Sequence, residues 1–251
     1  MEFTLPETNL LKVSRMSEKG NLGIFVLEPL SPGYGMTVGN SLRRVLLSSL
    51  EGAAITRVKI AGVSHEFSTL PGCRDDVVDI ILNLKKMRLK SDSNEPITLK
   101  LSKKGPGDVK ASDFAKNAQV QIVDPAHYLA QLDSKGKISL EATVEKGRGY
   151  IPVEERKEEK MPLGTIALDA VFTPVKKVHY TVENTRVGGK TNFDKLSLEI
   201  TTDGSISPTA ALSSAAKILS EHFALVGELE DIKKRTVTAK APSKAKIKKI
   251  V

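Results

Sequence analysis

Residues 27–50 read LEPLSPGYGMTVGNSLRRVLLSSL, and this stretch decides the fold. It follows an apolar run at residues 24–27, which predicts a strand that ends at Pro29. A turn rich in proline and glycine comes next. A helix is then expected over residues 37–50, because apolar residues recur at helical spacing.

The predicted helix has two unlike faces. One face carries Val38, Leu42, Val45, Leu46 and Ser49. Arg43 and Leu47 lie beside that face, and Arg44 lies roughly opposite it. We therefore expect the apolar face to pack on a sheet, while the arginine pair remains available for another role.

Residues 27–50 resemble the signature of the alpha subunit of bacterial-type DNA-directed RNA polymerase, bacterial or plastid, in its N-terminal assembly region. Similar blocks follow in the family's order: VSHEFST (63–69), DIILNLK (79–85), GRGYIP (147–152), DAVFTPV (169–175) and YTVENTRV (180–187). The resemblance extends over nearly all of residues 5–232. The C-terminal DNA-binding domain of full alpha subunits has no counterpart in the sequence.

The resemblance implies a structural subunit that homodimerises and holds the beta and beta-prime subunits for transcription, with omega in the same complex. Such a chain belongs to a nucleotidyltransferase without carrying its catalytic residues, and the sequence shows no aspartate cluster for a two-metal centre. DNA contact is expected only indirectly or through the basic tail. The implied location is the bacterial cytoplasm, with the nucleoid, or the plastid stroma.

The resemblance also implies contact residues. The beta subunit is expected at Arg43, Arg44, Leu47 and Lys85. The beta-prime subunit is expected at Asp169, Ala170, Val171, Phe172, Thr173, Pro174 and Val175. An arginine fork suits a carboxylate on a partner, because its donors match carboxylate geometry.

The formal charge of +8 describes the end of the chain. Residues 233–251 hold eight lysines and arginines and no acid, and the rest of the chain carries 30 residues of each sign. Composition therefore does not imply a folded basic surface for nucleic acid. Residues 236–251 are expected to be a disordered, basic tail.

No membrane span, secretory signal, metal or cofactor is expected. The apolar runs are too short to cross a bilayer, and the single cysteine, Cys73, suits a reducing compartment. The histidines do not pair at metal-ligand spacing; they are His65, His127, His179 and His222. The glycines at 33–39 read G-x-G-x-x-x-G, one residue longer than the dinucleotide-binding fingerprint.

The pattern predicts an α+β fold in which a sheet with two long helices, the dimerisation domain, holds an inserted and mostly β second domain. Residues 1–51 and 176–235 are expected to form the first domain and residues 52–175 the insert. Strands of the insert are expected near residues 56–60, 63–70, 97–101, 120–123 and 138–144, with a helix that opens at Asp75 and Asp76. Strands of the first domain are expected at residues 178–182 and 196–200.

The last predicted helix begins at Pro208 behind the cap Ser207 and extends to about Arg235. It carries two apolar stripes, which together are wider than one core requires. Either one core within the chain covers both stripes, or the second stripe packs against another copy. We place the dimer interface at Leu212, Ala216, Leu219, Phe223 and Val226.

Two other functions remain open on the residues alone. The chain is alternatively a basic-tailed nucleic-acid-binding module that is not part of a polymerase. It is also compatible with a small dimeric enzyme that binds phosphate at the glycine turn.

Overall fold

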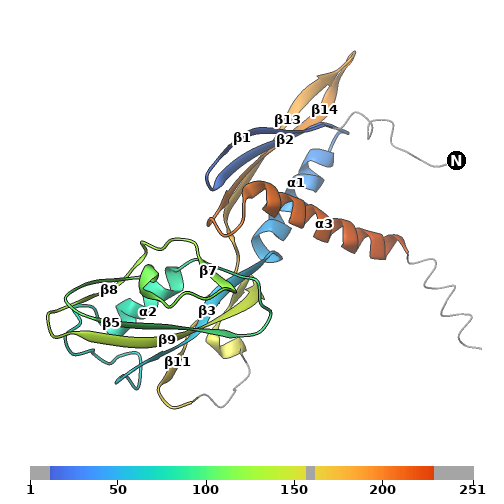
Figure 1. Ribbon diagram of the computed structural model, residues 1–251. Helices are drawn as coiled ribbons and strands as arrows, with labels where there is room; N and C mark the ends of the chain where they lie inside the picture. Colours follow the sequence, from blue (N-terminus) through green and yellow to red (C-terminus); the bar gives the residue numbers. More distant parts are fainter. Residues whose placement is uncertain (1–11, 157–161, 229–251) are drawn as a thin grey trace, which may run out of the picture.

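One end of the molecule is a four-stranded antiparallel sheet on which two helices pack (Figure 1). The structure, a computed structural model, describes residues 12–156 and 162–228, without the side chains of residues 14–16. Within these ranges the strand order is β1 (Lys12–Lys19), β2 (Leu22–Leu30), β14 (Lys190–Thr202) and β13 (Val175–Val187). The helices are α1 (Tyr34–Ser48) and α3 (Pro208–Gly227).

Alternating side chains of β14 form the buried face of this sheet. Leu196, Leu198 and Ile200 are fully buried, as their period of two predicts. Leu42 and Leu46 of α1 lie in the same apolar cluster. The predicted packing of the α1 apolar face on a sheet is therefore confirmed.

Two glycines allow α1 to approach the sheet closely. A Cβ atom at Gly35 would lie 2.7 Å from Val182, and one at Gly39 would lie 2.8 Å from the Tyr180 ring. Among the three glycines of this pattern, Gly33 alone has a positive φ, 84°, which the turn into α1 requires. Tight packing and one turn thus account for the pattern that resembles a nucleotide motif.

The bounds of α1 differ from the prediction. The helix begins at Tyr34 rather than Thr37, because Gly33 turns the chain directly into the first helical residue. It ends at Ser48 rather than Leu50, because the chain soon enters the next strand.

The prediction that Pro29 ends the strand is wrong, because β2 continues through it to Leu30. The register between β2 and β14 shifts at this point, between the pair of Leu30 with Asp194 and the pair of Leu27 with Leu196. Proline is tolerated there because its missing N–H interrupts no regular ladder.

The other end of the molecule is mostly β and contains the residues between α1 and β13 (Figure 1). Its six-stranded sheet has the order β5 (Ile97–Lys104), β9 (Lys137–Arg148), β3 (Glu51–Ile60), β4 (Leu89–Ser91) and β7 (Val120–Ile122), with β11 (Thr165–Ala167) paired to β3. Smaller sheets pair β6 (Gly107–Lys110) with β8 (Tyr128–Leu132), and β10 (Tyr150–Ile151) with β12 (Ala170–Val171). Short 3₁₀ turns, η1 and η2, occupy Ala111–Asp113 and Val153–Glu155.

Helix α2 (Val77–Lys86) packs against β3 and β8. Its first turn follows Asp76, close to the predicted start. Its predicted apolar side chains are all buried; they are Val77, Ile80, Ile81 and Leu84. The prediction for this helix is therefore confirmed.

The predicted strand over residues 63–70 is wrong. This segment forms turns, and its buried side chains are Val63 and Leu70, at the two ends. The apolar residues of this segment do not form one face of a strand; Val63 and Leu70 instead bury the two ends of a loop.

The described core divides into two large clusters of buried apolar residues. One cluster belongs to the four-stranded sheet with α1 and α3, and the other belongs to the six-stranded sheet with α2. A small third cluster contains Ala54, Ala170 and Phe172. The fold class is α+β, as predicted, with a sheet and two long helices at one end and a mostly β insert at the other.

Candidate partner-contact surfaces

The outer face of α1 carries two unpaired guanidinium groups. Arg43 and Arg44 are exposed, and neither guanidinium has a hydrogen bond or ion pair with another described residue. A guanidinium is always charged and offers five donors in a fixed plane. This face therefore fits an acceptor, most naturally a carboxylate, on another molecule.

Apolar side chains accompany the arginines. Leu47 is half-buried and packs against the cluster between the sheet, α1 and α3, so it serves the core as well as the surface. Met36 is exposed and absent from the predicted contact set. Its spacing of seven and eleven residues from Arg43 and Leu47 places it on the same side of α1, a signal already present in the sequence.

Lys85 and Asp169 form an ion pair inside this chain. Lys85 Nζ lies 2.8 Å from Asp169 Oδ2, and the backbone N–H of Val153 donates to Asp169 Oδ1 at 3.1 Å. The hydrogen bond from Lys85, assisted by that from Val153, lowers the pKa of the Asp169 carboxyl below its ordinary value. Lys85, a predicted beta contact, is thus paired with Asp169, a predicted beta-prime contact, and the Lys85 ammonium group is not a free cation.

The predicted beta-prime segment, residues 169–175, is mostly buried in its own chain. Its buried side chains are Ala170, Phe172, Pro174 and Val175. Val171 is 39% exposed, while Asp169 and Thr173 are half-buried. The prediction that all seven residues contact a partner is therefore too broad, because buried side chains present no surface.

Glycines of β3 and β9 leave the space in which this segment packs. A Cβ atom at Gly147 would lie 2.7 Å from the Phe172 ring, and one at Gly52 would overlap the Phe172 carbonyl oxygen. The backbone N–H of Phe172 donates to the Gly149 carbonyl at 2.8 Å. Residues of the block at 147–152 therefore pack against the segment that contains Phe172 and form a hydrogen bond with it.

The carbonyl of Thr56 holds two further chain segments. The register of β3 with β9 shifts at this fully buried residue, and its carbonyl accepts from Arg156 Nη1 at 3.1 Å and from the Leu168 N–H at 2.8 Å. Burial lowers the pKa of the Arg156 guanidinium. These bonds fix the chain on both sides of residues 157–161, which are not described.

Helix α3 buries its first half and exposes its second. Ala211 and Ala215 are fully buried, whereas Phe223 is 65% and Val226 is 61% exposed. Of the other predicted interface residues, Leu212 and Leu219 are half-buried and Ala216 is exposed. Figure 1 shows the outer end of α3 projecting away from the sheet. The interpretation that one core within the chain covers both apolar stripes of this helix is therefore wrong for the described residues.

The cap of α3 agrees with the prediction. Ser207 Oγ accepts a hydrogen bond of 3.2 Å from the backbone N–H of Ala210, and Pro208 follows the cap. The last turns predicted up to Arg235, and the predicted basic tail at 236–251, lie outside the described residues.

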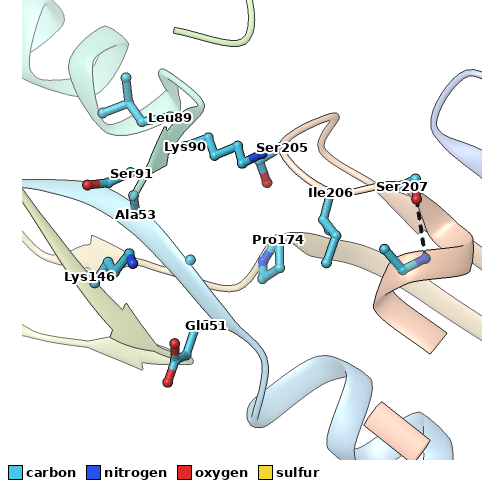
Figure 2. A pocket seen from close by; sticks show the side chains of 12 residues that line it. Glu51, Ala53, Leu89, Lys90, Ser91, Lys146, Pro174, Ser205, Ile206 and Ser207 are labelled. Carbon is cyan, nitrogen blue, oxygen red and sulfur yellow. Dashed lines mark hydrogen bonds between the residues drawn. The ribbon is translucent and has the colours of Figure 1, made fainter. Parts of the chain in front are cut away.

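A cleft of about 500 Å³ lies where the two ends of the molecule meet, and Figure 2 shows its lining side chains. Its walls come from the start of β3, from β4, from the end of β9, and from the start of α3 with the segment before it; they include Glu51, Leu89, Lys90, Lys146, Ile206 and Ser207. Pro174 is the one predicted contact residue that lines it. The cleft is thus separate from the outer face of α1.

The described residues contain no cluster of three or more histidine, cysteine, aspartate or glutamate side chains that is arranged to hold a metal ion. No helix in the described ranges is long and apolar enough to cross a membrane. The surface features of the described residues that bear on partners are the unpaired guanidiniums of Arg43 and Arg44, the ion pair of Lys85 with Asp169 and the exposed apolar end of α3.

Comparison with known proteins identifies the class of the insert first. Residues 58–173 match the family model described as the RNA polymerase Rpb3/RpoA insert domain. This range contains β9 and α2 and ends inside the segment 169–175.

Whole-chain relatives extend the match to both ends of the molecule. The chain is 54% identical over 210 residues to the DNA-directed RNA polymerase subunit alpha of Symbiobacterium thermophilum, covering 84% of this chain and 67% of the relative. It is 51% identical over 221 residues to that of Alkaliphilus metalliredigens, covering 88% and 70%. It is 47% identical over 233 residues to that of Roseiflexus castenholzii, covering 92% and 72%. The chain belongs to the family of the DNA-directed RNA polymerase alpha subunit, which does not favour the alternative of an unrelated nucleic-acid-binding module.

Proposed function

We propose that this chain is the assembly subunit of a DNA-directed RNA polymerase. It pairs with a second copy and holds the beta and beta-prime subunits, in a complex that also contains omega. It carries no catalytic residue itself and acts in the cytoplasm. Family membership supports the polymerase, and the chain's surfaces support the scaffolding role.

The exposed end of α3 is the observation that carries the proposal. Phe223, Leu225 and Val226 are large apolar side chains that remain mostly in water in the single chain. Contiguous exposed apolar surface marks an interaction site, and a second copy of the same chain supplies a self-complementary partner. We therefore assign the dimer interface to α3, at Leu212, Ala216, Leu219, Phe223 and Val226.

The other two surfaces face the large subunits in this proposal. Arg43, Arg44 and Leu47 on α1 contact beta, where an acceptor meets the unpaired guanidiniums. Val171, with the exposed parts of Asp169 and Thr173, contacts beta-prime beside Lys85. Identical chains then meet different partners, and those partners break the symmetry of the dimer.

The division into domains supports this arrangement. Residues 1–51 and 176–235 form the dimerisation domain in our proposal, and residues 52–175 form the insert. The separation of the described core into two large clusters supports a division near residues 51 and 175, with Val175 itself in the cluster of the four-stranded sheet.

Two measurements test the proposal. The full chain should co-purify with the beta and beta-prime subunits, and light scattering should give two chains per particle. The change Phe223→Asp should give one chain per particle, because it places a charge in the apolar contact. The control Leu163→Asp alters an exposed leucine away from α3 and should leave the dimer intact. A dimer that persists with Phe223→Asp would remove α3 from the interface.

A further inference from the structure

The cleft that Figure 2 shows lies between the insert and the four-stranded sheet with its two helices. Its volume of about 500 Å³ suits a small molecule, and small-molecule sites lie preferentially at domain interfaces. The chain enters the insert just before Glu51 and leaves it at Pro174, and both residues line the cleft. A molecule bound there would therefore contact both parts of the protein at their junction.

Apolar side chains from both parts of the protein line the cleft. Leu89 belongs to the core cluster of the six-stranded sheet, and Ala53 packs against that cluster. Ile206 packs against the cluster of the four-stranded sheet. Ala210, in the first turns of α3, also lines the cleft and is exposed. The lining thus offers contacts to the apolar body of a ligand.

Two lysines on either side of β3 give the cleft a positive charge. The Lys90 ammonium group has no hydrogen bond or ion pair with a described residue. Figure 2 shows its side chain extending from β4 in the direction of Ser205. Lys146 of β9 is half-buried, and its one partner among the described residues is the neutral Oδ1 atom of Asn94, at 3.4 Å.

These lysines have no acidic partner among the described residues. Glu51 is the only acid among the described residues that line the cleft, and its carboxylate is already paired with Arg148 at 2.6 Å. A half-buried ammonium group gains most from an anionic partner, because a charged acceptor makes the stronger hydrogen bond. The charges of the cleft therefore fit an anion rather than a neutral molecule or a cation.

We propose that this cleft binds a small organic anion of the medium-chain fatty acid type, which combines one carboxylate with an apolar body. The carboxylate meets Lys90 and Lys146, while the apolar body contacts Ala53, Leu89 and Ile206. The site is separate from the surfaces proposed for beta, beta-prime and the second copy. Because this ligand binds the folded chain at its junction, it also raises the stability of the fold.

Isothermal titration of the full chain with octanoate, below its micelle concentration, tests the class of ligand. Octanol supplies the same apolar body without the charge, and inorganic phosphate supplies charge without the apolar body. We expect octanoate to bind at least about tenfold more tightly than either probe, since it alone makes both kinds of contact. Octanoate should also raise the urea midpoint of the chain.

The charge contact is tested by changing the two lysines. Lys90→Gln with Lys146→Gln should weaken octanoate binding about tenfold or more, because it removes the charged donors, and should leave octanol binding unchanged. The matched control is Lys116→Gln with Lys135→Gln. It removes two exposed lysines of the insert that lie outside the cleft, so octanoate should bind as it does to the unaltered chain.

The place of binding is tested by filling the cleft. Ala210 is exposed, so Ala210→Phe adds its ring in the cleft rather than in a core, and octanoate binding should be lost. Ala126→Phe changes an exposed alanine in a turn of the insert outside the cleft and should bind octanoate normally. Urea midpoints without ligand show that each variant is folded. The lysine variants test the site independently if Ala210→Phe lowers its midpoint.

Four results would overturn the inference. Octanoate that binds no more tightly than octanol or phosphate would show that the cleft does not require both charge and apolar body. Unchanged octanoate binding after both lysines are altered would remove the charge contact. Binding that survives in folded Ala210→Phe would place the ligand elsewhere. Binding of an oligoglutamate peptide without binding of octanoate would show that the occupant is an acidic protein segment.

Discussion

Asp194 Oδ2 accepts a hydrogen bond of 2.9 Å from the backbone N–H of Gly35, across 159 positions of the chain. The same oxygen accepts from the N–H of Gly33 at 2.9 Å. The first N–H groups of a helix have no partner within it, and a carboxylate there also interacts favourably with the helix dipole. A side chain of β14 thus fixes the beginning of α1, the helix that carries the arginine pair.

Asp194→Ala should destabilise the chain by about 2–3 kcal/mol, because it leaves the buried N–H of Gly35 and the partly buried N–H of Gly33 without their acceptor. Asp194→Asn keeps an acceptor oxygen and should cost roughly 1 kcal/mol. Urea unfolding followed by circular dichroism measures both. Equal midpoints for the alanine variant and the unaltered chain would contradict this role for Asp194.

Gly39→Ala should destabilise the chain although alanine favours helices. The added Cβ would lie 2.8 Å from the Tyr180 ring and 2.9 Å from Leu196, so α1 or the sheet must shift. Overpacking of this kind costs about 1–3 kcal/mol, against a gain of about 1 kcal/mol in helix propensity. The difference is a net loss of up to about 2 kcal/mol in urea unfolding.

Gly227→Ala is the matched control for Gly39→Ala. Gly227 is also helical, but a Cβ atom there meets nothing within 4 Å. Its effect should be neutral or stabilising by up to about 1 kcal/mol. If both alanine changes stabilise the chain equally, close helix–sheet contact is not the reason for Gly39.

The sequence predicts those elements whose periodicity reflects burial. The apolar stripes of α1 and α2 and the alternation of β14 face the core, and the cap at Ser207 is local chemistry that needs no tertiary partner. In contrast, β1 reads KVSRMSEK, a charged edge strand without an apolar period, and it is not predictable by this signal. The loop at 63–70 misleads for the converse reason, because apolar residues there recur without a common face.

For the contact surfaces too, the sequence predicts what depends on one segment and misses what depends on distant residues. Exposure of Arg43 and Arg44 follows from the helical wheel of one segment. The pairing of Lys85 with Asp169 joins residues 84 positions apart, and no pattern within either segment indicates it. Burial of Phe172 depends on glycines of two other strands, so the sequence alone overstates how much of residues 169–175 is surface.

Asp169→Asn should lower stability in a manner that depends on pH. The pKa of Asp169 is lowered in the folded chain by Lys85, so the ionised carboxylate stabilises folding. This stabilisation is complete above the unfolded pKa of about 4 and is lost as the pH falls through the lower folded pKa. We expect a cost of about 1–2 kcal/mol at neutral pH, shrinking towards zero in acid.

The measurement is urea unfolding of both proteins between neutral pH and about pH 3. Asp92→Asn serves as the control, because Asp92 is exposed and its carboxylate has no bond to a described residue. A cost for Asp169→Asn that stays constant over this pH range would show that the ion pair is not its source.

Arg44→Ala should weaken binding of beta and leave the fold and the dimer unchanged. The Arg44 guanidinium is exposed and has no partner in the described residues, so its removal breaks no internal contact. In the complex it would leave a partner carboxylate unpaired, which costs about 2–5 kcal/mol when that pair is buried. Recovery of beta in a pull-down should fall about tenfold or more.

Arg44→Lys keeps the charge but loses the planar fork of donors, so it should restore part of the binding if the contact is bidentate. Lys116→Ala removes an exposed cation from a loop of the insert and should bind beta normally. Urea midpoints and light scattering of all three variants should match the unaltered chain. Normal beta recovery with Arg44→Ala would move the contact away from α1, whereas loss of binding with full rescue by lysine would indicate a simple charge rather than a fork.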